Sequence, residues 1–73
     1  MAASNHSMPD RKLELVSSLV KAEYQEMPGL SLTLEQAQRL FGVELGLCRR
    51  VLSGLLDNGY LRKTPSGKYA RTA

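Results

Sequence analysis

The chain has 73 residues, of which 42% are hydrophobic and 5% aromatic, and a formal net charge of +3 at pH 7. This length predicts one domain that buries only about 60% of its unfolded surface, so its stability must be modest. The one Cys excludes an intrachain disulfide. With no second Cys or neighbouring His, it also excludes a metal site, so we expect a reducing compartment, no metal and no cofactor. No apolar run approaches the ~20 residues that span a bilayer, and residues 1–8 lack the pattern of a signal peptide. We therefore expect a soluble, cytoplasmic protein that does not bind membranes.

The net charge conceals an asymmetry along the chain. Residues 1–46 carry four basic and six acidic side chains, whereas residues 47–73 carry six basic ones and a single acid, Asp57. Clustered positive charge favours a surface that faces a polyanion, and an ordinary solvated surface is the alternative. The charge pattern indicates nucleic acid as a candidate partner without settling the matter.

The N-terminal part of the chain predicts a tail followed by a helix. Residues 1–6 are small and polar without periodicity, and we expect a disordered tail ahead of a single domain over residues 7–73. Ser7 is a suitable N-cap, and Pro28-Gly29 ends the helix. Apolar residues at helical spacing predict a stripe that faces the core. This stripe comprises Leu13, Val16, Val20, Tyr24 and Met27.

The same helix is apolar on nearly its opposite side as well, at Leu15, Leu19 and Ala22. A helix that is apolar on two sides is expected to be buried on both. Two interpretations are open: these residues form a surface for a second copy or a protein partner, or another part of the chain covers them.

The central part of the chain predicts a brief strand and a second helix. Residues 31–33 are compatible with a short strand. Thr33 and Gln36 have the spacing of a capping box at the start of a helix over residues 34–41, and Gly42 is suited to the left-handed conformation that ends it. The apolar side of this helix is expected to comprise Leu34, Ala37, Leu40 and Phe41.

A third helix and a hairpin are expected in the remaining residues. Residues 44–58 show the apolar periodicity of a helix that Asn58-Gly59 ends, although Glu44 is a weak N-cap. Residues 60–64 and 68–72 are two strand candidates, joined by a Pro65-Ser66-Gly67 loop that suits a hairpin. The buried face of the third helix is expected to comprise Cys48, Val51, Leu52, Leu55 and Leu56.

This order of elements over residues 31–72 resembles the winged helix-turn-helix family, and the first helix fits it more loosely. The resemblance is carried by apolar positions around a turn glycine and by the passage from helix to wing. These residues are Ala37, Phe41, Gly42, Val43, Cys48 and Val51, followed by Leu55, Gly59, Leu61, Gly67 and Tyr69. The resemblance, which is strongest to small bacterial winged-helix regulators, implies a mainly α fold with a small β-hairpin, in which three helices precede a C-terminal wing. It also implies transcription regulation through binding of double-stranded DNA.

The resemblance further implies that the third helix, residues 44–58, enters the major groove with its exposed residues. On a helical wheel, the residues that point away from the core stripe, or flank that direction, are Gly46, Leu47, Arg49, Arg50, Ser53, Gly54 and Asp57. We expect Arg50 to be the principal DNA contact, because a guanidinium can donate two hydrogen bonds to guanine or bind a phosphate, with Arg49 and Ser53 beside it. Gly46 either permits a close approach to DNA or is tolerated at a helix start. Leu47 contacts either a thymine methyl group or a protein.

The predicted wing, residues 60–72, adds four basic residues, which are Arg62, Lys63, Lys68 and Arg71. Because side chains alternate along a strand, these four cannot all point the same way, and some should pack their aliphatic stems over Leu61 or Tyr69. Lys63 and Lys68 lie nearest the tip and are the expected phosphate contacts.

The other polar residues predict no catalysis. The sequence shows no paired carboxylates, no nucleophile with a base and no glycine-rich phosphate loop, so we expect neither an enzyme nor a small-molecule ligand. Cys48 is expected to be a small core residue, and the tyrosines to lie in the core or at its rim. The leading hypothesis is therefore a DNA-binding module that acts as a dimer. The alternative is a winged-helix module for protein interaction or assembly without DNA binding, which the two-sided first helix favours.

Overall fold

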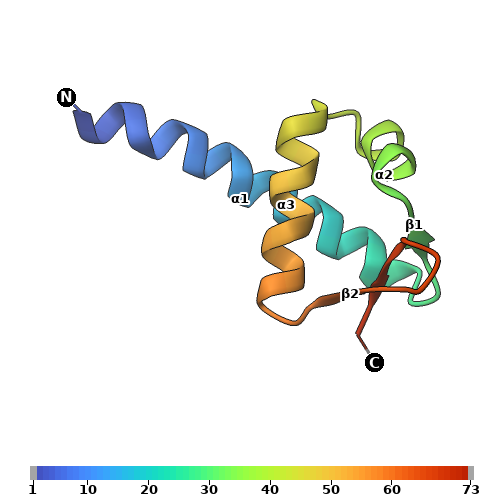
Figure 1. Cartoon of the computed structure of the whole chain (residues 1–73). Coiled ribbons are helices and arrows are strands. Elements are labelled where there is room, and N and C mark those ends of the chain that lie inside the picture. Colours follow the sequence, from blue (N-terminus) through green and yellow to red (C-terminus); the bar gives the residue numbers. More distant parts are fainter. Residues whose placement is uncertain (1, 73) are drawn as a thin grey trace.

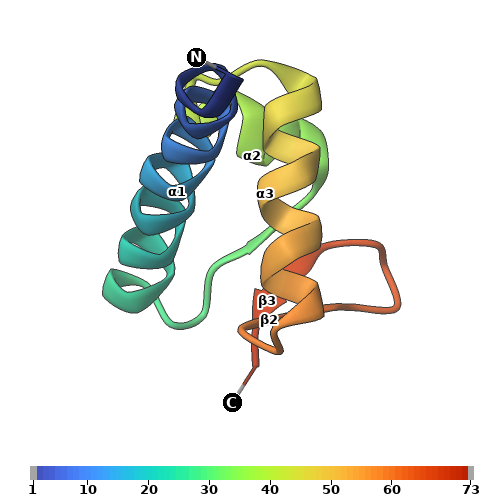
Figure 2. The same cartoon turned by 90° about the vertical axis from the view of Figure 1, so that its left-hand side faces the viewer.

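The computed structural model describes the backbone of residues 2–72 and the side chains of residues 11–72. This part of the chain forms the helices α1 (Ala2–Glu26), α2 (Leu34–Phe41) and α3 (Leu45–Asp57) and the short strands β1 (Ser31–Leu32), β2 (Leu61–Lys63) and β3 (Tyr69–Arg71). The strands form one antiparallel sheet in the order β1-β3-β2. Figures 1 and 2 show α1 packed beside α3, α2 near the start of α3, and the hairpin of β2 and β3 at the other end of α3. The predicted fold class, mainly α with three helices and a C-terminal wing, is confirmed.

The second helix begins and ends as its sequence predicts. The Thr33 hydroxyl accepts a hydrogen bond from the Gln36 backbone N–H at 3.1 Å, and the Gln36 side chain accepts one from the Thr33 backbone N–H at 3.0 Å. Gly42 ends α2 in the left-handed region with φ of 64°. The reciprocal cap fixes the start of α2, and the left-handed turn at Gly42 ends the helix before the chain enters α3.

The wing is a short hairpin whose loop is held by its own residues. The Gly67 backbone N–H donates to the Thr64 carbonyl at 2.9 Å, with Pro65 and Ser66 between them, and Gly67 has φ of 83°. The Thr64 hydroxyl also accepts from the Lys68 backbone N–H at 3.0 Å. A turn that opens with Pro and closes with a left-handed Gly is the usual three-residue hairpin connection, so the loop is confirmed as predicted.

The core joins all three helices to the sheet. Its buried side chains come from α1, α2, α3 and both strands of the wing, and they include Tyr24, Ala37, Cys48, Val51, Leu52, Leu55, Leu61 and Tyr69. Tyr24 lies on α1, and its hydroxyl donates a buried hydrogen bond of 2.7 Å to the Tyr69 carbonyl on β3. This bond satisfies the one polar atom that the tyrosine brings into the core and fastens the first helix to the wing.

Three expectations about packing are corrected. The first helix begins at Ala2 rather than near Ser7, so residues 2–6 are helical and not an irregular tail. Ala2 and Ala3 have the highest helix propensity, but this start places Pro9 inside the helix, where it lacks the backbone N–H, so local propensity does not explain the extension. Met27 lies beyond the end of α1 and is 45% exposed, and Leu40 is 50% exposed because the short α2 contacts the core mainly through Ala37 and Phe41.

The length and hydropathy of the helices also bear on membrane insertion. Among the residues that the structure describes, no helix is at once long enough and apolar enough to cross a bilayer.

Candidate nucleic-acid interface

One side of α3 faces solvent along the whole helix. Six of the seven residues that the helical wheel directs outward, or beside that direction, are exposed; they are Gly46, Arg49, Arg50, Ser53, Gly54 and Asp57. The opposite side of α3, which carries Cys48, Val51, Leu52 and Leu55, is buried against α1, α2 and the wing. At 1.5 Å per residue, the exposed side extends over about 16 Å. The structure thus brings Arg49, Arg50 and Ser53 together on one accessible helical surface, with the acid Asp57 at its far end.

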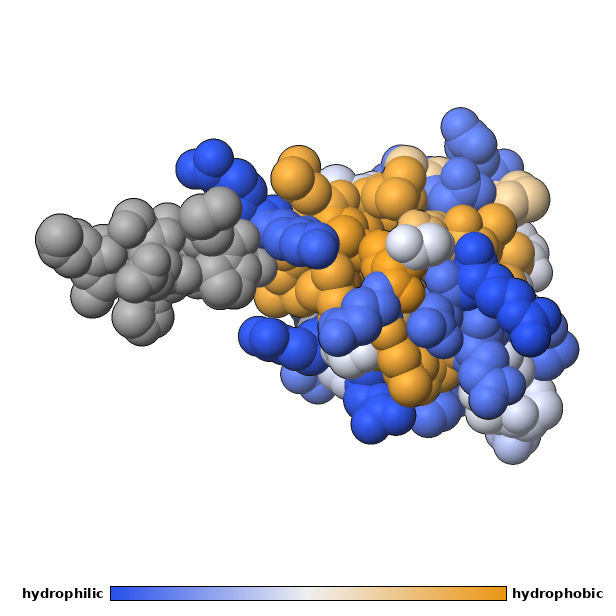
Figure 3. Space-filling view, turned by 90° about the horizontal axis from the view of Figure 1, so that it is seen from above, coloured by the Kyte–Doolittle hydropathy of each residue, from blue (hydrophilic) through white to orange (hydrophobic). Residues whose placement is uncertain are grey.

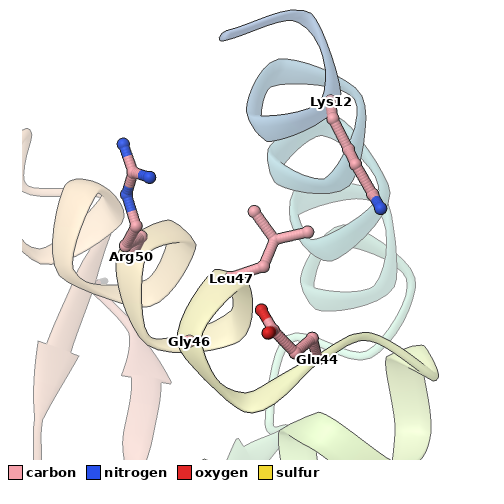
Figure 4. A pocket seen from close by; sticks show the side chains of 5 residues that line it. All are labelled: Lys12, Glu44, Gly46, Leu47 and Arg50. Atoms are coloured by element: carbon pink, nitrogen blue, oxygen red, sulfur yellow. The ribbon is translucent and has the colours of Figure 1, made fainter. Parts of the chain in front are cut away.

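Leu47 does not belong to this outward face. It is half-buried, packs against the core and points from α3 toward α1 (Figure 4). Together with Lys12, Glu44, Gly46 and Arg50 it lines an open groove of about 390 Å³ between α1 and the start of α3. Leu47 therefore packs partly within its own chain, and neither of its two expected contacts is tested.

Glu44 is the N-cap of α3, but its side chain makes no capping hydrogen bond. A Cβ placed on Gly46 would meet the Glu44 Oε1 atom at 3.4 Å, so this carboxylate lies close over the first turn of the helix. A negative charge there interacts favourably with the partial positive charge of the helix N-terminus. It also lowers the positive potential of the groove that Lys12 and Arg50 line.

Three of the four basic residues of the wing lie in strands, and they divide between the two faces of the sheet. In the β2–β3 register, Leu61 lies opposite Arg71, Arg62 opposite Ala70, and Lys63 opposite Tyr69. Side chains of paired residues share a face, so Lys63 and Arg71 lie on the Leu61 face and Arg62 lies on the other. The expectation that the four cannot all point the same way is confirmed.

Two of these wing cations rest on aromatic rings. The Lys63 ammonium lies 5.0 Å from the centre of the Tyr69 ring, and the Arg71 guanidinium lies 5.7 Å from the centre of the Tyr60 ring. Such contacts orient a charge while leaving its outer side open to solvent. Lys68 is half-buried at the base of the loop, and Arg62 is exposed. Arg62 and Arg71, with Pro28 and Thr72, also line a second open groove.

Tertiary packing adds two basic residues that sequence reasoning missed. Lys12 of α1 comes to line the same groove as Arg50, and the ammonium of Lys21 lies 5.6 Å from the centre of the Tyr60 ring. Neither had a signal in the sequence, because each meets its neighbours only when α1 packs beside α3 and the wing.

Potential metal ligands and the one cysteine are the remaining chemically reactive groups. The described residues contain no group of three His, Cys, Asp or Glu side chains close enough to hold a metal ion. Cys48 is a free thiol in the core, and its burial raises the pKa of the thiol above its usual value. A buried thiol with a raised pKa is a poor nucleophile, so Cys48 is a packing residue as expected.

The chain matches no protein-family model, no curated protein and no solved structure.

Proposed function

We propose that the chain is a double-stranded DNA-binding module, a small transcription regulator of the winged helix-turn-helix kind, in which α3 enters the major groove and the wing contacts the phosphate backbone. The observation that carries this proposal is the exposed side of α3, on which Arg49, Arg50 and Ser53 stand together while the rest of the helix is held by the core. A helix presented in this way fits the width of the major groove.

The roles within this surface follow from the side chains. Arg50 would read a guanine with two hydrogen bonds or bind a phosphate, and Arg49 and Ser53 would contact the adjacent backbone. Gly46 would allow the start of α3 to approach the DNA closely. The wing would add phosphate contacts from Arg62, Lys63, Lys68 and Arg71, of which the last three have side chains that the wing itself supports or partly buries.

The test is a titration of a labelled, mixed-sequence duplex of DNA with the full chain at several salt concentrations, followed by fluorescence anisotropy. If four to six basic residues meet phosphates, the logarithm of the affinity should fall against the logarithm of the salt concentration with a slope of roughly −4 to −5. The double variant Arg50→Ala/Lys68→Ala should bind more weakly and reduce the steepness of that slope by roughly 2.

Arg39→Ala is the matched control, since it removes an exposed arginine of α2 that lies outside the proposed contact. It should bind the duplex with nearly the native affinity. Absent binding, a slope near zero, or equal losses in the control and the double variant would contradict the DNA-binding proposal.

A second candidate is a module for protein interaction without DNA binding. It is favoured by the exposure of Leu15 and Leu19 on α1, which are 65% and 47% accessible. Large exposed apolar residues on one helix face commonly mark an interaction surface. The same titration distinguishes the two candidate functions, because a protein-interaction module would show no steep salt-dependent affinity for the duplex.

A further inference from the structure

The outer side of α1 is an exposed surface with an apolar centre and charged ends. Leu15, Leu19 and Ala22 are all exposed, so the expectation that another part of the chain covers them is wrong for the described residues. The space-filling view from above shows one face of the molecule, on which apolar atoms reach the surface among hydrophilic side chains (Figure 3). Arg11 lies at the N-terminal end of this side of α1 and Glu26 at its C-terminal end, and both are exposed.

We propose that a second copy of the chain docks on this surface, so that two α1 helices pair antiparallel about a twofold axis between residues 18 and 19. We define the α1 outer face as the exposed residues Arg11, Leu15, Ser18, Leu19, Ala22 and Glu26. On a helical wheel these six fall within about a third of the circumference, on nearly the opposite side from the buried Val16, Val20 and Tyr24. Docking there leaves the core of each copy intact.

The order of residues along the α1 outer face is what identifies a second copy as the occupant. In one antiparallel register, Arg11 meets Glu26 of the other copy, and Leu15 meets Ala22. The same register places Ser18 against Leu19 at the twofold axis. All three pairs arise from a single axis, as a self-complementary twofold interface requires.

The chemistry of each pair supports this register. A cation faces a carboxylate at both ends of the contact, and a large side chain faces a small one, which lets the helices approach and interdigitate. Parallel pairing would instead set Arg11 beside Arg11 and Glu26 beside Glu26, which like-charge repulsion disfavours. The flanking charges are mixed, since Lys12 and Glu14 lie at one end and Lys21 and Glu23 at the other, so the charge argument for the register depends on Arg11 and Glu26 alone.

The size of this contact sets its strength. Residues 11 and 26 are about 22 Å apart along the helix. A contact between two helices over that length buries less than the roughly 1,600 Å² of a standard protein interface, so the dimer should be weak, with a Kd on the order of tens of micromolar. The proposed DNA contact uses α3 and the wing, so this pairing and the DNA-binding proposal can fail independently.

The first experiment measures mass by sedimentation velocity and light scattering over a concentration series of the full chain without DNA. We expect a reversible monomer–dimer equilibrium that Leu19→Glu weakens at least about tenfold. Leu40→Glu is the matched control, because Leu40 is an equally exposed leucine on α2, and it should leave the Kd unchanged. The proposal is overturned if the native protein stays monomeric at millimolar concentration, or if Leu19→Glu leaves the Kd of the dimer unchanged.

Charge reversal then tests the register. Arg11→Glu and Glu26→Arg should each raise the Kd by about tenfold, because each change sets like charges against each other at both ends of the dimer. The double variant Arg11→Glu/Glu26→Arg restores both attractions and should return to within about threefold of the native Kd. A double variant that is weaker than either single variant overturns the antiparallel register.

Cross-linking tests the position of the axis. Ser18→Cys places two thiols beside the twofold axis, within reach of a disulfide, and mild oxidation should convert most of the protein to a covalent dimer. Gln25→Cys is the control, since two copies of that position lie about 20 Å apart in this register. The native Cys48 is buried and should not contribute. Equal cross-linking of the two variants, or cross-linking of Gln25→Cys alone, overturns the proposal, and a stable complex with a different protein that excludes the dimer does so as well.

Discussion

Gly42 and Gly54 differ in backbone conformation, although neither would crowd a neighbour if it carried a side chain. Gly42 has φ of 64° at the end of α2, whereas Gly54 lies within α3, and an added Cβ would meet nothing within 4 Å at either position. Any difference between alanine substitutions at the two positions must therefore come from the backbone rather than from packing.

Gly42→Ala should lower the free energy of unfolding by about 1 kcal/mol, because an L-residue pays a penalty in the left-handed region. Gly54→Ala should raise that free energy by up to about 1 kcal/mol, because alanine is the better helix former. Urea denaturation followed by circular dichroism measures both changes, and the slope against urea should stay the same. Shifts of the same sign in the two variants would contradict this account.

At the scale of the element, α2 and α3 begin in different ways. Thr33 and Gln36 satisfy each other's backbone N–H groups at the start of α2, whereas the Glu44 side chain caps no N–H group at the start of α3. The second helix therefore begins at a fixed point, while the third depends on its buried face for most of its stability. This difference makes the start of α3 the easier place to improve.

Thr33→Ala should lower the free energy of unfolding by about 1 kcal/mol, since it removes a cap. Glu44→Ser should raise it by about 0.5 kcal/mol, because a serine cap bond exceeds the charge–dipole attraction that is lost. Glu35→Ser, in the first turn of α2, is the control, since it removes a similarly placed acid without providing a cap and should be slightly destabilising. Urea denaturation measures the three variants. A loss of stability in Glu44→Ser equal to that in the control would show that α3 gains nothing from a better cap.

At the scale of the whole molecule, local sequence patterns predict the helices and turns well, but they predict poorly how these elements pack against one another. Three features depend only on residues that are close together in the sequence, so the sequence predicts them with their boundaries. They are the capping box at Thr33, the turn at Gly42 and the loop before Lys68. The outward face of α3 follows from its apolar periodicity alone. Each of these features depends on contacts within a few residues.

The start of α1 and the exposure of Met27 are misses within one element, whereas the other misses depend on contacts between distant segments. The exposure of Leu40 is set by how little of α2 reaches the core, and the groove shared by Lys12 and Arg50 exists only once α1 lies beside α3. The hydrogen bond from Tyr24 to the Tyr69 carbonyl joins residues 45 positions apart. Helical periodicity assigns Tyr24 to the core but cannot specify which carbonyl its hydroxyl meets.

That buried tyrosine links global stability to alkaline pH. Burial, with a further contribution from the charge on Cys48, raises the pKa of Tyr24 from 10.0 to about 12. The folded state therefore holds the phenolic proton more tightly than the unfolded state does. The stabilisation is fully present below pH 10 and is lost as the pH rises from 10 through about 12, because there the unfolded chain has already released its proton.

Comparison of the native protein with Tyr24→Phe isolates this effect from other groups that titrate in the same range. Below pH 10 the variant should be less stable by ~1 kcal/mol, because it loses the hydrogen bond to the Tyr69 carbonyl. Between pH 10 and 12 the free energy of unfolding of the native protein falls by up to about 2 kcal/mol, because the unfolded chain releases the Tyr24 proton at lower pH than the folded chain. Tyr24→Phe lacks this loss, so the difference in stability between the two proteins should shrink and then reverse. Urea denaturation at intervals from pH 8 to 12 measures both proteins. A difference that stays constant over this range would mean that Tyr24 ionises without unfolding the core, and that the contact between α1 and the wing is not closed to water.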